Sequence, residues 1–311
     1  MMKTPKLSRR AALGLGIAAV FGPGQLWAQT ARPDVEGGIG GTGIVGLLTD
    51  FGSLIVAGNY LRTDAQTRYT DGFGRLSKSD LQVGDSLTVE ASGPSNALVA
   101  RRVHVTHPVV GTITARSGNG REITVNGVTV RLDQRAGAFG VGARVAVSGL
   151  WRGPLVQGAR LAPARSTQDL VSGDVTRSGG VTRVGGVAVR GNGTGSIAPG
   201  SFASIVGRFN ADTGVLQAAR VSNARFTGAA GALARLSIEG YLDPTSRAPG
   251  YRVAGLGHSF ERNLNLSAFA TSRVLLNGAY TGRFAAQGAV VLPEGFGAQR
   301  RVLRQISQRF R

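Results

Sequence analysis

The sequence predicts an all-β protein made of tandem small OB-like β-barrels, each of about five strands. Three observations lead to this fold class. A pattern of about sixty residues recurs four times. Glycine accounts for 48 of 311 residues and aromatic residues for only 6%, which is typical of a turn-rich protein with a core of small aliphatic side chains. Apolar residues also alternate with polar ones between closely spaced turn signals, which favours small barrels over one large sandwich.

Two signatures define the recurring pattern. The first is a glycine that closes an early strand at intervals of about 65 residues, at Gly46, Gly111, Gly173 and Gly240. The second is a small-residue turn followed by alternating apolar residues, at 84–91, 142–149, 200–207 and 271–278. Together they predict four β-barrel repeats, at 43–106, 107–164, 169–226 and 236–296.

The amino-terminal residues 1–28 are typical of an export signal. Four basic residues precede the apolar stretch Ala11–Phe21, which is too short to span a bilayer. The segment around Arg9 and Arg10 resembles a twin-arginine signal, and an ordinary secretory signal is the alternative. We therefore expect a periplasmic or extracellular protein, cleaved after Ala28 and without a transmembrane segment in its mature chain. The chain has no cysteine, which excludes disulfides and a lipid anchor on cysteine.

A Gly-rich linker, 29–42, leads into the first repeat, whose polar middle, Tyr60–Lys78, predicts a long loop. The second repeat carries the strongest hairpin signal, Asn126-Gly127 between β-branched runs, because both central positions of such a turn need positive φ. Similar hairpins are expected at 182–189 and, more weakly, at 251–256. Units of about sixty residues are marginally stable alone, so we expect neighbouring repeats to pack on one another.

Several of these segments carry a family resemblance. They are the early Gly111-Thr112-Ile113, the hairpin 125–130, the segment Leu81–Asp85 before an alternating strand, and Ala-Arg-Val at the end of a unit. Together they resemble the bacterial family DUF5666, a domain of unknown function, repeated along the mature chain. The resemblance implies exported, β-rich modules and transfers no functional residue.

The charge balance predicts attraction to anionic partners. Removal of the signal, which holds four basic and no acidic residues, lowers the formal net charge from +19 to +15. Almost all of this charge is arginine, which suits bidentate contacts with carboxylate or phosphate, although a GC-rich genome would produce the same bias. Export argues against a nucleic-acid partner.

Local motifs for catalysis or cofactor binding are weak. His104 and His107 have odd spacing in a strand-like segment, and His258 stands alone, so we predict no metal site. The glycines of 38–43 match a dinucleotide-binding pattern, but they precede a strand and no helix follows, so we predict no cofactor. Asp85 occupies a turn position and suits a turn former better than an acid catalyst.

Two sets of residues are candidates for ligand contacts. Aromatic residues that follow a strand-ending glycine, with arginines beside two of them, are candidates for stacking on a ligand: Trp151, Arg152, Arg208, Phe209 and Tyr280. Packing in the core or at a barrel rim is the alternative for these aromatic side chains.

The basic tail, 297–311, forms a basic amphipathic pattern if it is helical. Its apolar stripe is Leu303, Ile306 and Phe310. Its arginines are candidates for contact with an anionic surface: Arg300, Arg301, Arg304, Arg309 and Arg311. The alternatives are a solvated tail or a helix that docks on the last barrel.

The sequence as a whole predicts an exported, non-enzymatic binding or scaffold protein of the bacterial cell envelope, whose ligand or protein partner is unknown. A carbohydrate-active hydrolase is the alternative, because catalytic carboxylates come from distant positions and leave no local motif.

Overall fold

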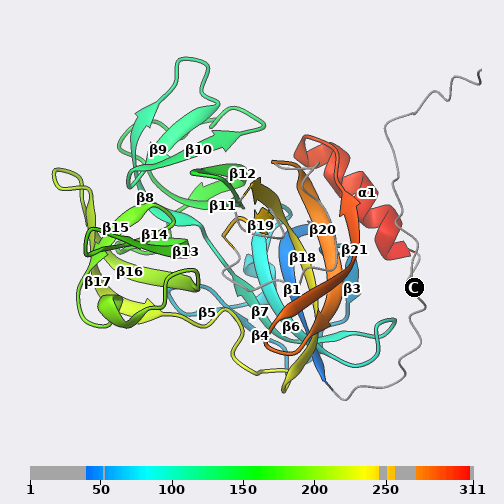
Figure 1. Ribbon diagram of the computed structural model, residues 1–311. Coiled ribbons are helices and arrows are strands. Elements are labelled where there is room, and N and C mark those ends of the chain that lie inside the picture. The colour runs from blue at the N-terminus through cyan, green and yellow to red at the C-terminus, as the bar shows by residue number, and fades with distance from the viewer. Residues whose placement is uncertain (1–39, 52, 245–250, 256–270, 309–311) are drawn as a thin grey trace, which may run out of the picture.

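The computed structural model describes residues 40–51, 53–244, 251–255 and 271–308. The predicted export signal and most of the predicted linker lie outside these residues, as do His258, Arg309 and Arg311. The described chain is mostly β-strand, as predicted, and its strands follow one another in four groups that lie against each other (Figure 1).

The four strand groups are defined as follows. Group one holds β1 (Gly41–Asp50), β2 (Leu54–Val56), β3 (Asn59–Leu61), β4 (Arg68–Thr70), β5 (Arg75–Leu76), the 3-10 turn η1 (Lys78–Asp80), β6 (Ser86–Ser92) and β7 (Val99–Val105). Group two holds β8 (Val109–Arg116), β9 (Glu122–Val125), β10 (Val128–Leu132), β11 (Arg144–Arg152) and β12 (Leu155–Pro163). Group three holds β13 (Asp169–Ser178), β14 (Val181–Val184), β15 (Val187–Arg190), η2 (Thr194–Ser196), β16 (Phe202–Asn210) and β17 (Val215–Ser222). Group four holds β18 (Leu233–Pro244), β19 (Tyr251–Val253), β20 (Arg273–Tyr280) and β21 (Phe284–Val291), and the helix α1 (Phe296–Gln308) follows it.

Strand pairing closes on itself in groups two and three. In group two the pairing runs β8-β9-β10-β12-β11 and returns to β8, and in group three it runs β13-β14-β15-β17-β16 and returns to β13. The pairs β10–β12 and β15–β17 are parallel, and all other neighbouring strands within these two groups are antiparallel. An antiparallel contact between β8 and β13 joins the two rings into one ten-stranded sheet.

Groups one and four form the second sheet, in which β1 and β18 pair in parallel. In group one, β4 and β5 form a small hairpin that pairs in parallel with β7. The predicted long loop at Tyr60–Lys78 is therefore wrong in part, because β4 and β5 lie within it and are held by sheet hydrogen bonds, while turns connect them. In group four, β18 pairs with β19 and β20, and β20 pairs with β21.

The predicted hairpin in the second repeat is confirmed. Strands β9 and β10 pair across Asn126-Gly127, and both residues have positive φ, 48° and 76°. Ala57-Gly58 and Gly185-Gly186 turn the hairpins of groups one and three in the same way. The register also shifts between Glu90 and Ala91, Ser148 and Gly149, Val206 and Gly207, and Asn277 and Gly278. These shifts mark a β-bulge at the recurring small residue, which bends the strand and helps to close a ring.

The apolar cores follow the sheets. Groups two and three share one core, whose buried side chains include Ile113, Trp151 and Ile205. The core of group one also takes in Leu275 of β20 and Leu303 of α1, and group four has a third core, around Phe284. Within the described residues, no helix has the length and apolar character needed to cross a membrane.

Candidate functional site

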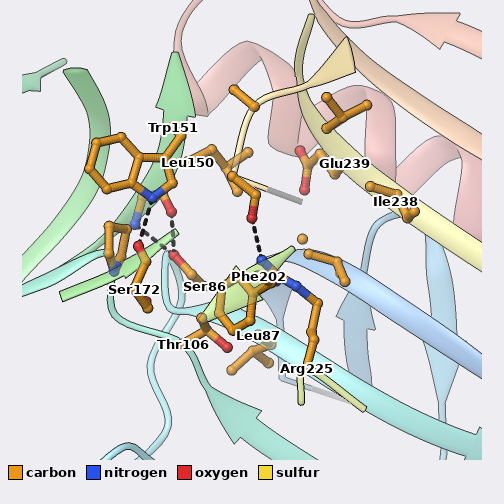
Figure 2. Close-up of a pocket in the computed structure, with 17 residues that line it drawn as sticks. Ser86, Leu87, Thr106, Leu150, Trp151, Ser172, Phe202, Arg225, Ile238 and Glu239 are labelled. Atoms are coloured by element: carbon orange, nitrogen blue, oxygen red, sulfur yellow. Dashed lines mark hydrogen bonds between the residues drawn. The ribbon is translucent and has the colours of Figure 1, made fainter. Parts of the chain in front are cut away.

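The described residues enclose a small cavity where all four strand groups meet. Its volume is about 40 Å³, and its walls include Ser86 of group one, Trp151 of group two, Ser172 and Phe202 of group three and Glu239 of group four (Figure 2). A water molecule needs about 10–15 Å³ by this measure, so the cavity has room for a few water molecules and none for a sugar.

The polar groups on the cavity wall bond to one another. The Trp151 indole Nε1 donates to the Ser172 carbonyl at 2.9 Å, and the ring is only 7% exposed (Figure 2). The Ser86 hydroxyl donates to the Gly149 carbonyl at 2.7 Å and accepts from the Gly149 amide at 2.6 Å. These bonds connect three strand groups, so this cavity is primarily a structural junction.

Arg225 is the buried cation of this junction. Its guanidinium lies 3.8 Å from the centre of the Phe202 ring and donates to the carbonyl of Gly255 (Figure 2). Burial lowers the pKa of Arg225 to about 10, against the opposing effect of the Asp174 carboxylate. Burial likewise raises the pKa of Asp174, whose Oδ2 accepts from the Gly255 amide at 3.1 Å. Arg225 and Asp174 therefore both bind the backbone of Gly255, which joins group three to the segment that follows β19.

An open groove of about 610 Å³ lies between group two and the segment that precedes α1. Its volume is in the range of small-molecule sites. The walls are mostly polar and carry arginine, carboxylate and amide side chains, with Leu132 as their apolar residue: Ser117, Asn119, Arg121, Glu122, Arg131, Leu132, Asp133, Arg152, Gln157, Glu294 and Gly295.

The groove's carboxylates all have partners. Arg131 pairs with Glu122 at 3.4 Å, and Arg152 pairs with Glu294 at 3.6 Å. Asp133 accepts from the Gln157 amide at 2.8 Å and from the first backbone amide of α1, at Phe296, at 2.7 Å.

The groove's arginines are available to a ligand. Within the described part of the chain, the exposed Arg121 guanidinium has no ion pair or hydrogen bond. The Arg131–Glu122 pair is solvent-exposed, and in the Arg152–Glu294 pair the carboxylate is exposed and the arginine is partly buried. Exposed pairs contribute at most about 1 kcal/mol. An anionic ligand can therefore take the place of a carboxylate beside Arg131 or Arg152 at small cost. The arrangement suits recognition of carboxylate or phosphate.

The structure does not bring the predicted stacking residues together. Trp151 is buried against backbone at Gly173, Gly185 and Gly255, and its ring has no open face for a ligand. Phe209 packs on the core shared by groups two and three, and Tyr280 packs on the core of group four. The packing alternative describes these three aromatic side chains, because each is needed to fill a core or a junction.

The two arginines of that predicted set lie apart. Arg208 is exposed on β16. Arg152 lies on the wall of the groove, with its guanidinium 5.0 Å from the centre of the Tyr241 ring. Of the five predicted stacking residues, Arg152 is the one that lines the groove.

Most of the predicted basic tail lies in the helix α1, which contacts the last group through the hydrogen bond between Arg273 and Gln299, as one alternative held, and also docks on group one. Leu303 is fully buried there, beside the partly buried Ile306. Arg300 donates to the Thr49 carbonyl, and Arg304 pairs with Asp50 at 3.0 Å. The described part of the apolar stripe, Leu303 and Ile306, packs on the protein itself and is not free to enter a lipid surface, while Phe310 lies outside the described residues. Arg301 is the described tail arginine that remains exposed without an ion pair.

The histidines take separate partners. His104 Nδ1 lies 2.9 Å from the Thr70 hydroxyl, and His107 Nδ1 lies 3.1 Å from the Val147 carbonyl. Burial lowers the pKa of His104 to about 3 and also lowers that of His107. In the portion that the structure describes, no three His, Cys, Asp or Glu side chains gather as metal ligands would.

Asp85 acts in a turn, as the sequence predicts, and also in a contact between groups. Its Oδ2 accepts from the Gln82 amide at 2.7 Å, while its Oδ1 pairs with Arg160 of group two at 2.6 Å. The contact with Arg160 could not be predicted from local sequence, because Arg160 is distant from Asp85 along the chain.

Comparison with known proteins identifies one segment. Residues 42–104 match the model of DUF5666, a domain of unknown function. The DUF5666 match runs from β1 to β7, within group one. Comparison with curated proteins and with solved structures found no match. The wider resemblance of the other repeats to DUF5666 stays a prediction.

Sequence analysis missed most of the groove. Apart from Arg152, none of the charged residues there was predicted; they lie in or directly beside β9 and β10 and in the segment before α1. The high arginine content was the one sequence feature that agreed with such a site. Composition does not show which arginines lie together in the folded protein.

Proposed function

We propose that this protein is a non-enzymatic binding or scaffold module, exported to the cell envelope, that holds a small anionic ligand in the groove of group two. The observation that carries the proposal is the meeting of Arg121, Arg131 and Arg152 around one open groove of ligand size. Arginine recognises carboxylate and phosphate groups through two parallel hydrogen bonds, which suits acidic sugars and phosphate esters.

A scaffold role draws support from the ion pairs and hydrogen bonds between groups. Asp85 of group one pairs with Arg160 of group two at 2.6 Å, and Glu239 of group four accepts from the Leu47 amide of group one at 2.9 Å. The Gly153 amide of group two donates to Asp243 of group four at 3.0 Å. Removing one partner of a buried pair typically costs about 3–5 kcal/mol, so contacts of this kind hold the groups in a defined arrangement.

We also propose that the four groups are copies of one OB-like barrel, related to the DUF5666 segment. The recurring bulge at Ala91, Gly149, Gly207 and Gly278 and the same strand order in groups two and three support this interpretation. Four copies packed together would stabilise units that are too small to be stable alone.

The hydrolase alternative draws less support from the groove. A glycosidase needs one carboxyl group to protonate the leaving oxygen and a second to act as base or nucleophile. Here Glu122 and Glu294 each face an arginine, and Asp133 is engaged by Gln157 and Phe296. These contacts favour binding over proton transfer.

Titration of the isotope-labelled mature protein with digalacturonate, followed by amide NMR, tests the groove. We expect saturable shift changes at Ser117, Arg121 and Gln157. Arg121→Gln combined with Arg152→Gln should weaken binding about tenfold, while the control Arg235→Gln, on an exposed arginine of group four, should not. Shift changes confined to other surfaces would refute the groove, and release of monomer would favour the hydrolase.

A further inference from the structure

Group three carries positive charge that its own acids do not balance. Asp169 pairs with Arg144 at 3.0 Å, and Asp174 is directed toward Gly255 and Arg252, so both carboxylates of β13 are engaged at contacts with other groups. Among the described residues of this group, Asp212 is the remaining acid, and it lies in the turn between β16 and β17. Arg183, Arg190 and Arg208 are exposed and have no ion pair with any described residue.

Strand register places these arginines on one outer face. Arg190 of β15 is opposite Gln217 of β17, and Gln217 is opposite Arg208 of β16. All three side chains are exposed and form a row across three adjacent strands. Neighbouring strands lie about 4.8 Å apart, so the two arginines of the row stand about 10 Å apart at their backbones.

Arg183 extends the row diagonally. It is opposite Ala188 on β15, and Ala188 shares its face with Arg190, two positions later. The alternate residues of these strands point into the core, where Val184, Val189 and Leu216 are almost fully buried. The arginines therefore project from a packed sheet, which reduces the entropy lost on binding.

The surroundings indicate which kind of polyanion fits. The large exposed apolar residues of the described chain are Phe51, Val141 and Val291, and all three lie outside group three. Contact with a membrane normally adds apolar insertion to charge. Phe209 packs inward and Phe73 packs against the apolar cluster that holds Val206, so both rings are engaged in packing, whereas stacking on nucleobases needs an open ring face. An outer sheet face with spaced arginines suits a chain of acidic sugars.

We propose that the row formed by Arg183, Arg190 and Arg208 binds an acidic polysaccharide that carries carboxylate or sulfate groups. This surface is separate from the groove, and polysaccharide binding here does not depend on the groove's ligand.

Affinity electrophoresis of the mature protein through polygalacturonate, with neutral dextran as the reference, tests the proposal. We expect Arg183→Gln, Arg190→Gln and Arg208→Gln together to weaken binding about tenfold at low salt, because three exposed charge contacts are lost. The matched control replaces Arg68, Arg235 and Arg283, which are also exposed, with Gln. Unchanged thermal unfolding of both triple variants confirms intact folding.

Three outcomes would overturn the proposal. Equal weakening by both triple variants would show attraction to net charge alone. If Arg121→Gln abolished polymer binding while the group three variant still bound the polymer, the groove would be the polymer site. The protein could instead bind anionic vesicles or single-stranded DNA more tightly than polygalacturonate and lose that binding in the group three variant. The partner of the row would then be a membrane or a nucleic acid and not a polysaccharide.

Discussion

Asn126 lies directly on Gly111 and occupies the space where any other residue would have a side chain. Its Nδ2 donates to the Val110 carbonyl at 2.9 Å, and a Cβ on Gly111 would come within 2.2 Å of its amide atoms. Gly46 meets Ala57, and Gly173 meets Gly185, at the corresponding places in groups one and three. In groups one to three the early glycine therefore leaves room for the hairpin turn that folds back onto it, and at Gly46 and Gly173 it also leaves room for a side chain of another group.

Gly111→Ala should destabilise the protein by about 2–4 kcal/mol, because the methyl group overpacks the site and displaces a buried hydrogen bond. Urea denaturation measures the change. Combining Gly111→Ala with Asn126→Gly should recover part of the loss, since the second change makes room for the methyl group. Strictly additive effects of the two changes would contradict the contact.

Acidification should destabilise the protein below about pH 6.5. Burial holds the pKa of His104 at about 3, so the unfolded imidazole takes up a proton that the folded one does not, and stability falls as the pH decreases from 6.5 toward 3. The loss between pH 6.5 and 5 should be roughly 1–2 kcal/mol from this residue. Thermal unfolding at several pH values should show a smaller dependence for His104→Gln, and an unchanged dependence would show that other groups cause it.

Leu303→Ala should destabilise the protein by about 2–5 kcal/mol, because this fully buried side chain anchors α1 in the core of group one. Arg301→Ala, on the exposed side of the same helix, is the control and should change stability by less than about 0.5 kcal/mol. Equal, small effects in urea denaturation would mean that the helix does not dock.

Arg9→Lys combined with Arg10→Lys should leave precursor in the cytoplasm if the twin-arginine route carries the protein. Cell fractionation and immunoblotting measure the distribution. A control that changes Lys3 and Lys6 to Arg keeps the charge and the twin arginines, and it should be exported normally. Normal export of the twin-lysine variant would assign the protein to the general secretory route.

Hairpins were predictable from the sequence because their signals are local. Asn126-Gly127 needs positive φ whatever surrounds it, and the alternating residues on either side identify the strands. The segment 60–78 was not predictable in this way, because its polar residues resemble a loop and form strands β4 and β5 only by pairing with β7 and with each other.

The candidate site was less accessible to sequence analysis than the fold. Trp151 has the same position relative to its strand-ending glycine as Phe209 and Tyr280, yet only the packing of four groups places it in a buried junction. Arg121, Arg152 and Glu294 meet in one groove although they come from distant parts of the chain.

The sequence by itself determined the β class, the hairpins at positive-φ residues and the excess of arginine, because backbone sterics, residue alternation and charge act locally or as sums over the chain. The tertiary structure decided that α1 docks on groups one and four, that the aromatic residues serve packing, and which arginines lie together at the groove and on group three. These outcomes depend on complementary shapes and charges of residues that are far apart in sequence.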